Sequence, residues 1–158
     1  MMKRDIRLLL DNIRSVHNVG SIFRTAETLG VSKIYCLGTT PTPLDRFGNK
    51  RKDFAKVSLG AEDMVAWEHV ENAEKLIKTL RKDKFEVIAL EQSKKSVDYK
   101  EVKMGDKALI ILGSEVEGVS KDLLKMSDTI GEIPMMGKKE SLNVSIAGAV
   151  FLYRLLDQ

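Results

Sequence analysis

Three short polar segments hold the side chains of this sequence that are best suited to chemistry. In the first, a helix that begins at Asn18 would place Arg24 on its polar side, near the helix N-terminus. Backbone N–H groups and the helix dipole attract anions at that end, and a guanidinium there suits a phosphate or a developing negative charge. The same spacing also fits a capping asparagine and a solvated surface arginine.

The second segment follows an apolar run at residues 108–112. Gly113 ends that run and would let a ligand approach the backbone closely. Glu115 would then lie at the carboxyl edge of a sheet, where open α/β sheets bind ligands. An ordinary strand-to-helix loop would use the same residue types, so this segment is not decisive alone.

The third segment spans residues 132–145, where a strand-like piece ends at Pro134 and a basic loop leads into the last helix. Exposed polar groups between two buried elements often form binding sites. The segment offers an apolar slot from Ile133, Met135 and Leu142, and polar groups from Ser141 and Asn143.

Alternating strands and helices must position these segments, and such alternation predicts an α/β fold with a parallel sheet flanked by helices. Residues 39–57 hold two of the three prolines and no predicted element. Apolar runs predict strands over residues 6–10, 33–37, 86–90, 108–112 and 129–135, and apolar stripes predict helices over 18–29, 71–83, 142–156 and a short stretch capped by Ser120 that ends at 126.

Composition narrows the class of protein. A chain of 158 residues with 43% hydrophobic and 31% charged residues is typical of one soluble globular domain. Cys36 is the only cysteine, which excludes a disulfide framework within one chain and fits the cytoplasm. The sequence has neither a membrane-length apolar run nor a signal peptide, and no Gly-x-Gly-x-x-Gly fingerprint follows its first predicted strand. The net charge of +3 permits a nucleic-acid partner without requiring one.

Two further stretches have alternative interpretations. The helix at 142–156 is apolar on two sides, so either a partner subunit or the core of a monomer would cover its second side. Residues 46–56 hold five cations and two aromatic rings, which suit RNA phosphates and unstacked bases but also fit a solvated loop. The candidate RNA-binding residues are Arg46, Lys50, Arg51 and Lys52 of this stretch, together with Arg24 of the first segment.

Taken together, and in this order, the three polar segments resemble the motifs of the SpoU-type tRNA/rRNA 2′-O-methyltransferases of the SPOUT superfamily. Any one motif is weak, whereas the combination is specific, and the resemblance covers residues 6–158. The motifs read Asn18-x-Gly20-Ser21-x-x-Arg24-Thr25-Ala26, Gly113-Ser114-Glu115-x-x-Gly118 and Ile133-Pro134-Met135-x-Gly137-x-x-x-Ser141-Leu142-Asn143-Val144-Ser145.

The resemblance implies a parallel α/β sheet whose C-terminal part forms a deep trefoil knot, an arrangement that general folding rules would not suggest. It also implies S-adenosylmethionine as cofactor and a homodimer that includes the final helix. The implied main cofactor contacts are Gly113, Ile133 and Leu142, with Leu90, Met135, Gly137 and Ser141 nearby.

The implied reaction moves a methyl group from the sulfonium to a ribose 2′-hydroxyl of RNA, with no metal. Arg24 would act as the base or would bind a phosphate and so activate the hydroxyl. Because the pKa of an arginine exceeds ~12, phosphate positioning and electrostatic stabilisation are favoured. The residues implied to orient Arg24, the ribose and the loops are Asn18, Glu115, Ser141 and Asn143.

The substrate and some alternatives stay open at this stage. The chain resembles a single minimal catalytic domain, residues 1–158, without a separate RNA-binding extension, and tRNA is favoured over rRNA as the target. A catalytically silent dimeric scaffold that binds RNA or cofactor is the alternative. Methyl transfer to a base or a protein side chain is a further one. Intact Arg24, Glu115 and Asn143 argue against a silent protein, and Asn18 with Arg24 argues for the ribose hydroxyl.

Overall fold

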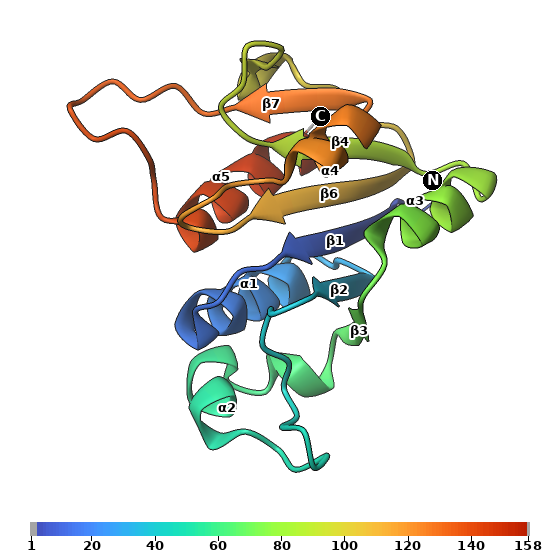
Figure 1. Cartoon of the computed structure of the whole chain (residues 1–158), viewed down its shortest axis with the longest axis vertical. Coiled ribbons are helices and arrows are strands. Elements are labelled where there is room, and N and C mark those ends of the chain that lie inside the picture. Colours follow the sequence, from blue (N-terminus) through green and yellow to red (C-terminus); the bar gives the residue numbers. More distant parts are fainter. Residues whose placement is uncertain (1–2, 158) are drawn as a thin grey trace.

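A seven-stranded parallel sheet forms the middle layer of the computed structural model, which describes residues 3–157 (Figure 1). The strand order is β3-β2-β1-β6-β4-β7-β5, and every neighbouring pair is parallel. The strands are β1 (Asp5–Asp11), β2 (Lys33–Leu37), β3 (Ala66–Val70), β4 (Glu86–Leu90), β5 (Val97–Asp98), β6 (Lys107–Gly113) and β7 (Thr129–Glu132).

The central strands β1 and β6 are buried on both faces, which explains their nearly continuous apolar sequences. Leu8 and Leu10 of β1 face one core cluster, and Leu9 faces the other. Asp11 is in register with Leu37 of β2 and with Gly113 of β6, so the carboxyl ends of these three strands lie level with one another. The loops that follow them therefore meet at the carboxyl edge of the sheet.

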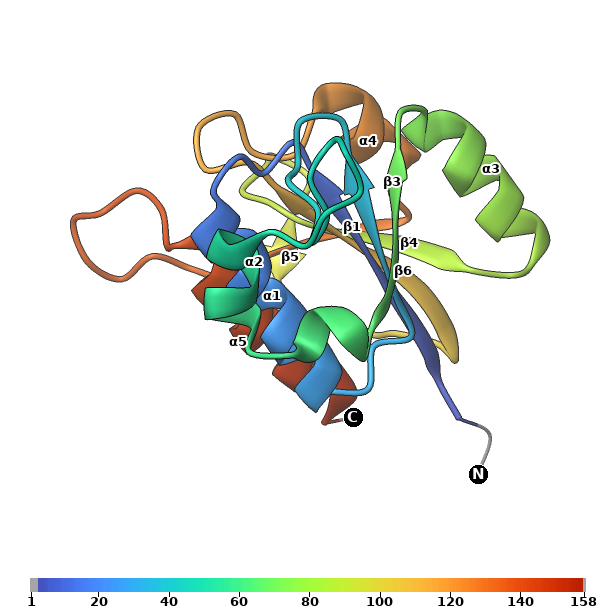
Figure 2. The same cartoon turned by 90° about the horizontal axis from the view of Figure 1, so that it is seen from below.

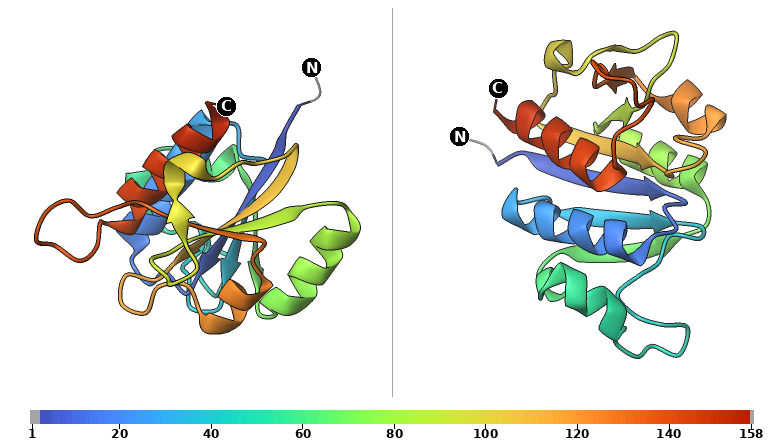
Figure 3. Two further views of the ribbon diagram at one scale, coloured as in Figure 1. Left: turned by 90° about the horizontal axis from the view of Figure 1, so that it is seen from above. Right: turned by 90° about the vertical axis from the view of Figure 1, so that its left-hand side faces the viewer.

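Helices cover both faces of the sheet (Figure 2). One core cluster joins the sheet to α1 (Val16–Thr28), α2 (Lys52–Ser58) and α5 (Val144–Leu156), and the other joins it to α3 (Ala73–Lys82) and α4 (Lys121–Met126). Short 3₁₀ turns, η1 (Ala61–Asp63) and η2 (Tyr99–Glu101), complete the layers. The loop between β7 and α5 stands away from the body in Figure 3.

The predicted α/β class is confirmed, with the five predicted strands and four predicted helices all present. The prediction that residues 39–57 contain no element is wrong, because α2 begins at Lys52. Phe54 of α2 is fully buried and packs edge-on against Phe23 of α1, with ring centroids 5.1 Å apart. This distant contact stabilises a helix that local sequence alone does not indicate. The trefoil knot stays a prediction.

The ends of several elements differ from their predicted limits. The strand expected to reach residue 135 stops at Glu132, and the last helix begins at Val144 with Asn143 as its cap. Ser15, rather than Asn18, caps α1: its hydroxyl accepts from the Asn18 backbone N–H at 3.1 Å. The Asn18 side chain is therefore available for other contacts. Ser120 does occupy the N-cap position of α4, without a side-chain hydrogen bond.

The described part of the chain also limits what kinds of site are present. Within residues 3–157, no helix is long and apolar enough to cross a membrane. In the same residues, no three His, Cys, Asp or Glu side chains are grouped so that they could hold a metal ion. Burial raises the pKa of the Cys36 thiol to about 12, so this thiol is protonated at neutral pH and unsuited to act as a nucleophile.

Candidate functional site

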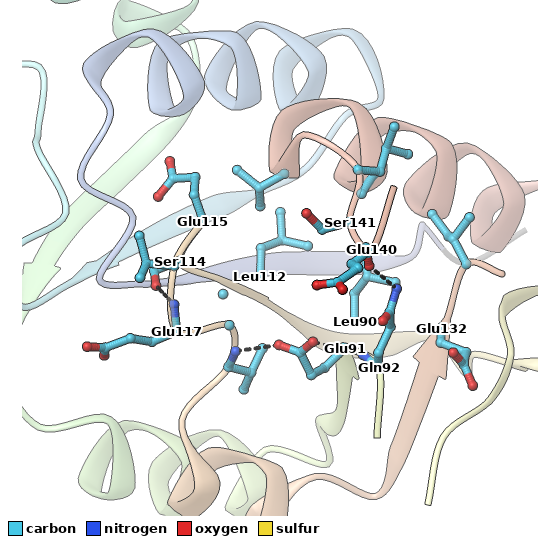
Figure 4. Close-up of a pocket in the computed structure, with 18 of the residues that line it drawn as sticks. Leu90, Glu91, Gln92, Leu112, Ser114, Glu115, Glu117, Glu132, Glu140 and Ser141 are labelled. Carbon is cyan, nitrogen blue, oxygen red and sulfur yellow. Dashed lines mark hydrogen bonds between the residues drawn. The ribbon is translucent and has the colours of Figure 1, made fainter. Parts of the chain in front are cut away.

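A pocket of about 830 Å³ lies at the carboxyl edge of the sheet, over the ends of β4, β6 and β7 (Figure 4). The β6–α4 loop forms one wall, and the β7–α5 loop with the first turn of α5 forms the other. Leu90 and Leu112 provide apolar surface from the strand ends. Gln92 donates through Nε2 to the backbone carbonyl of Glu140 at 3.1 Å and so connects β4 to the far wall.

Three side chains from distant parts of the sequence form a hydrogen-bonded chain beside the pocket. Asn18 Nδ2 donates to Glu115 Oε1 at 2.7 Å, and Asn143 Nδ2 donates to Asn18 Oδ1 at 3.1 Å. Asn143 Oδ1 accepts from the backbone N–H of Ser145 at 2.9 Å, which caps α5. Each amide thus uses its oxygen and its nitrogen, and the three polar segments of the sequence are joined. Glu115 and Asn143 both line the pocket.

Gly113 allows the chain to cross the end of β6. A Cβ at this position would lie 2.2 Å from the carbonyl carbon of Gly118 and 2.2 Å from the nitrogen of Val119. The close approach that the sequence indicated at Gly113 is therefore made by the chain's own backbone. Glycine is needed here to let the loop that carries Glu115 fold back over the strand.

Two carboxylates that the sequence analysis missed hold this loop from opposite sides. Asp11, which is only 3% exposed at the end of β1, accepts from the Ser120 N–H through Oδ2 at 2.8 Å. Glu91, directly after β4, accepts from the Val119 N–H through Oε2 at 2.7 Å (Figure 4). A carboxylate at the end of an apolar strand was the signal that could have identified both. Their acceptors fix the path of the β6–α4 loop.

Comparisons with known proteins agree with this arrangement. The model of the SpoU rRNA methylase family matches residues 5–153. The chain belongs to the SpoU rRNA methylase family.

Relatives of this SpoU family member include RNA-modifying enzymes. Over 99% of its length the chain is 30% identical to a tRNA (guanosine(18)-2′-O)-methyltransferase of Aquifex aeolicus, of which it covers 71%. Over 96% of its length it is 34% identical to an uncharacterized tRNA/rRNA methyltransferase of Archaeoglobus fulgidus, of which it covers 64%. The AdoMet-bound rRNA methyltransferase from Sinorhizobium meliloti matches 98% of the chain with a TM-score of 0.86 at 25% identity, and the match spans 56% of that structure. The chain thus spans between about half and three quarters of these relatives.

Most residues that the family resemblance assigned to the cofactor lie in the pocket of this SpoU family member. Gly137 does not: it lies in the exposed β7–α5 loop, and a Cβ there would meet nothing within 4 Å. The assigned residues that do line the pocket are Leu90, Gly113, Ile133, Met135, Ser141 and Leu142.

The charge of the lining was not anticipated. Five carboxylates and one ammonium line the pocket, and this imbalance favours a cationic ligand group. These glutamates come from three loops and from the end of β7, so no local sequence pattern indicates them. The charged lining residues are Glu91, Glu115, Glu117, Glu132, Glu140 and Lys121.

The structure does not bring Arg24 into the pocket of its own chain. Arg24 is exposed on α1 and is absent from the pocket lining, although Asn18 lies nearly two turns before it on the same helix. Helices α1 and α5 pack side by side on one face of the sheet, so Arg24 and α5 lie on the same side of the molecule (Figure 2).

The four candidate RNA-binding cations lie on the β2–α2 segment, apart from the pocket. Lys50 pairs with Asp63 at 3.2 Å, and Arg51 binds both carboxylate oxygens of Asp53 at 3.1 and 2.8 Å. The hydrogen bond to Asp53 raises the pKa of Arg51, and the reciprocal bond lowers the pKa of Asp53. Arg46 lies over the Phe47 ring, and Lys52 is exposed at the start of α2.

Proposed function

We propose that this SpoU family member transfers a methyl group from S-adenosylmethionine to a ribose 2′-hydroxyl of RNA, with tRNA favoured over rRNA. The observation that carries this proposal is the hydrogen-bonded chain of Asn18, Glu115 and Asn143 beside the pocket. It unites the three segments that resemble the family's motifs. The names of the relatives in Aquifex and Archaeoglobus support RNA methylation, and the Aquifex enzyme supports tRNA.

The pocket fits S-adenosylmethionine in size and chemistry. A volume of about 830 Å³ is within the range of small-molecule sites, about 300–1,000 Å³. Leu90, Leu112 and Ile133 offer apolar surface for an adenine ring, and the surplus of carboxylates suits the positive sulfonium and ammonium groups. When bound, the cofactor supplies an electrophilic methyl group on sulfur. Gly113, Ile133 and Leu142 would be its main contacts.

The residues of the chain would align the hydroxyl with that methyl group. Asn18 holds the Glu115 carboxylate, and Asn143 holds Asn18. We assign Glu115, Asn143 and Ser141 to orienting the ribose and the loops, because correct alignment accounts for much of the rate of such a transfer. Arg24 would bind an RNA phosphate and stabilise developing negative charge on the hydroxyl oxygen.

Exposed apolar side chains on α5 support a homodimer. Ile146, Val150 and Tyr153 recur at helical spacing along α5 and are 53%, 40% and 54% exposed, and Leu142, just before the helix, is 41% exposed. The opposite side of the helix is covered by the core through Phe151 and others. A second copy of the chain would bury the exposed stripe.

We further propose that the reaction needs no metal, that the protein acts in the cytoplasm, and that Arg46, Lys50, Arg51 and Lys52 contribute to RNA binding.

The proposed reaction is tested by methyl incorporation from radiolabelled S-adenosylmethionine into unmodified bulk tRNA and rRNA, followed by nucleoside analysis. We expect a 2′-O-methylated nucleoside with the wild-type protein. Arg24→Ala should abolish transfer while cofactor affinity stays nearly unchanged, since Arg24 lies outside the pocket. Lys82→Ala is the matched control, because Lys82 is exposed at the end of α3 on the other face of the sheet.

Other outcomes would contradict the proposal in different ways. Loss of cofactor binding by a folded Arg24→Ala variant would overturn the role given to Arg24. Cofactor binding without incorporation into any RNA would favour the silent scaffold. A methylated base instead of a methylated ribose would contradict the reaction itself.

A further inference from the structure

One aromatic side chain is not explained by the core or by the pocket. Of the five phenylalanines, Phe23, Phe54, Phe85 and Phe151 are buried, whereas Phe47 is 74% exposed. Leaving such a ring in water forgoes the favourable free energy of burying it. A single exposed apolar residue needs no explanation in general, but the surroundings of Phe47 are unusual in two respects.

First, the turn that carries Phe47 is well defined by its hydrogen bonds. The Asp45 carboxylate accepts from the backbone N–H groups of Phe47 and Asn49 at 2.8 and 2.9 Å. Leu44 and Lys50 form an antiparallel bridge below this turn. We call residues 45–49 the 45–49 tip. It is anchored next to α2, so the exposed ring is held at a defined place.

Second, a cation lies over the Phe47 ring, namely Arg46, and it has no carboxylate partner among the described residues. The guanidinium carbon of Arg46 lies 4.7 Å from the centroid of the Phe47 ring. The neighbouring cations differ, since Lys50 pairs with Asp63 and Arg51 pairs with Asp53. Lys52 is exposed as well, but Arg46 is the cation of this segment that lies over an aromatic face, and its charge stays available there for an external anion.

We propose that the 45–49 tip docks an unpaired nucleotide of the RNA substrate, with its base stacked on Phe47 and its phosphate held by Arg46. Aromatic faces stack on bases only when these are free of a duplex, and a guanidinium binds the phosphate of the same nucleotide. This inference rests on the proposed function, because it takes RNA as the substrate. It adds that the RNA presents a single-stranded nucleotide away from the methylated ribose.

The place of the tip in the fold agrees with such a second contact. Leu37 at the end of β2 and Gly113 at the end of β6 are both in register with Asp11. These two strand ends are therefore two strand spacings apart, about 10 Å. The segment after β2 then runs away from the sheet and past α2 (Figure 1). The tip thus lies at the same edge of the sheet as the pocket but to one side of it.

The test measures the affinity of the full chain for two fluorescein-labelled RNA probes by anisotropy. One probe is a single strand of mixed sequence with about 12 nucleotides, within the range of known single-strand sites, and the other is its perfect duplex. We expect Phe47→Ala to weaken single-strand binding by about 5- to 150-fold, the loss for one stacked base. Phe47→Leu should lose as much, whereas Phe47→Trp should bind at least as tightly as wild type.

Two further variants sharpen the comparison. Met64→Ala removes an apolar side chain that is 72% exposed at the end of η1, the 3₁₀ turn that follows α2. This variant should bind the single strand and the duplex as tightly as wild type. Arg46→Ala should reduce the slope of log affinity against log salt by about 0.7, the value for one phosphate contact on a single strand. Duplex affinity should not depend on Phe47 in any variant.

Results of two kinds would overturn the inference. Wild-type affinity in Phe47→Leu would mean that the ring acts only as an apolar surface, and equal losses on single strand and duplex would mean that no base is stacked. Methyl transfer is measured on the same preparations. If the enzyme transfers methyl groups but its single-strand affinity does not depend on Phe47, the proposed docking at the 45–49 tip is wrong and the proposed function stands. If single-strand affinity depends on Phe47 but the wild-type protein has no transferase activity, the docking is supported and the proposed function is wrong.

Discussion

At the scale of single residues, Asn18 is the side chain on which the candidate site depends most. It is 7% exposed, donates to Glu115 and accepts from Asn143. The family motifs identified all three residues and implied an orienting role for Asn18, whereas the helical spacing alone suggested that Asn18 caps the helix. Ser15 caps the helix instead, and the side-chain amide of Asn18 bonds Glu115 and Asn143, which lie 97 and 125 residues further along the chain. Contacts over such separations cannot be read from local spacing.

Asn18→Asp is the most informative substitution at this scale. An aspartate keeps the acceptor for Asn143 but places a carboxylate oxygen against Glu115, where 2.7 Å now separates donor and acceptor. Repulsion should lower kcat/KM by about 10- to 100-fold, as for a broken buried hydrogen bond. Adding Glu115→Gln should restore part of the loss, because the new amide can donate to Asp at position 18. A double-mutant cycle without any coupling between the two positions would contradict a direct interaction.

At the scale of elements, the sequence predicted what local patterns determine. Buried strands such as β1 and β6 are continuous apolar runs, and amphipathic helices such as α3 have clear stripes. The short strands β3 and β5 were missed because they are half-exposed and lie at the two edges of the sheet. The role of Asp11 was missed for a related reason: its partner is the backbone of Ser120, which has no side-chain signature.

Asp11→Asn tests whether this carboxylate holds the β6–α4 loop. Asp11 accepts from Asn12 Nδ2 at 2.9 Å and from the Ser120 N–H at 2.8 Å. The Asn12 amide is itself fixed, since its oxygen accepts from the Thr39 N–H at 2.9 Å. An amide at position 11 has one acceptor oxygen for two donors, so one pair must place N–H against N–H. We expect cofactor affinity to fall by about 10-fold, as for one unsatisfied buried hydrogen bond.

Hydrogen exchange locates the effect of Asp11→Asn. The amides of Val119 and Ser120 should exchange faster, while those in the middle of β1 and β6 keep their protection. Asp122→Asn is the matched control, because Asp122 is exposed in the first turn of α4 and should change neither quantity. Unchanged exchange at Val119 and Ser120 in the Asp11 variant would show that the loop is held without this carboxylate.

At the scale of the whole molecule, α5 connects the pocket with the exposed stripe proposed as the dimer interface. Asn143 caps the helix, and Val144 and Ala147 line the pocket. Gly148 lets the helix approach β6, because a Cβ there would lie 2.9 Å from Leu112 Cδ1. The helix therefore contacts the sheet on one side and presents Ile146 on the other. A dimer formed through this stripe would fix the helix whose first turn forms part of the pocket.

Ile146→Glu should separate the subunits while each one keeps its fold. Ile146 is 53% exposed in the single chain, so a glutamate costs little there, but in a dimer it would bury a charge without a partner. By sedimentation equilibrium we expect about twice 17.7 kDa for wild type and 17.7 kDa for the variant. Met64→Glu, at a 72% exposed position away from α5, should stay dimeric.

If wild type sedimented as a monomer at micromolar concentration, the exposed stripe on α5 would need another partner. If instead the monomeric variant bound cofactor as tightly as wild type, the pocket would be complete within one chain. A loss of methyl transfer in that variant would then mean that the second subunit is needed for RNA binding or for the placement of Arg24.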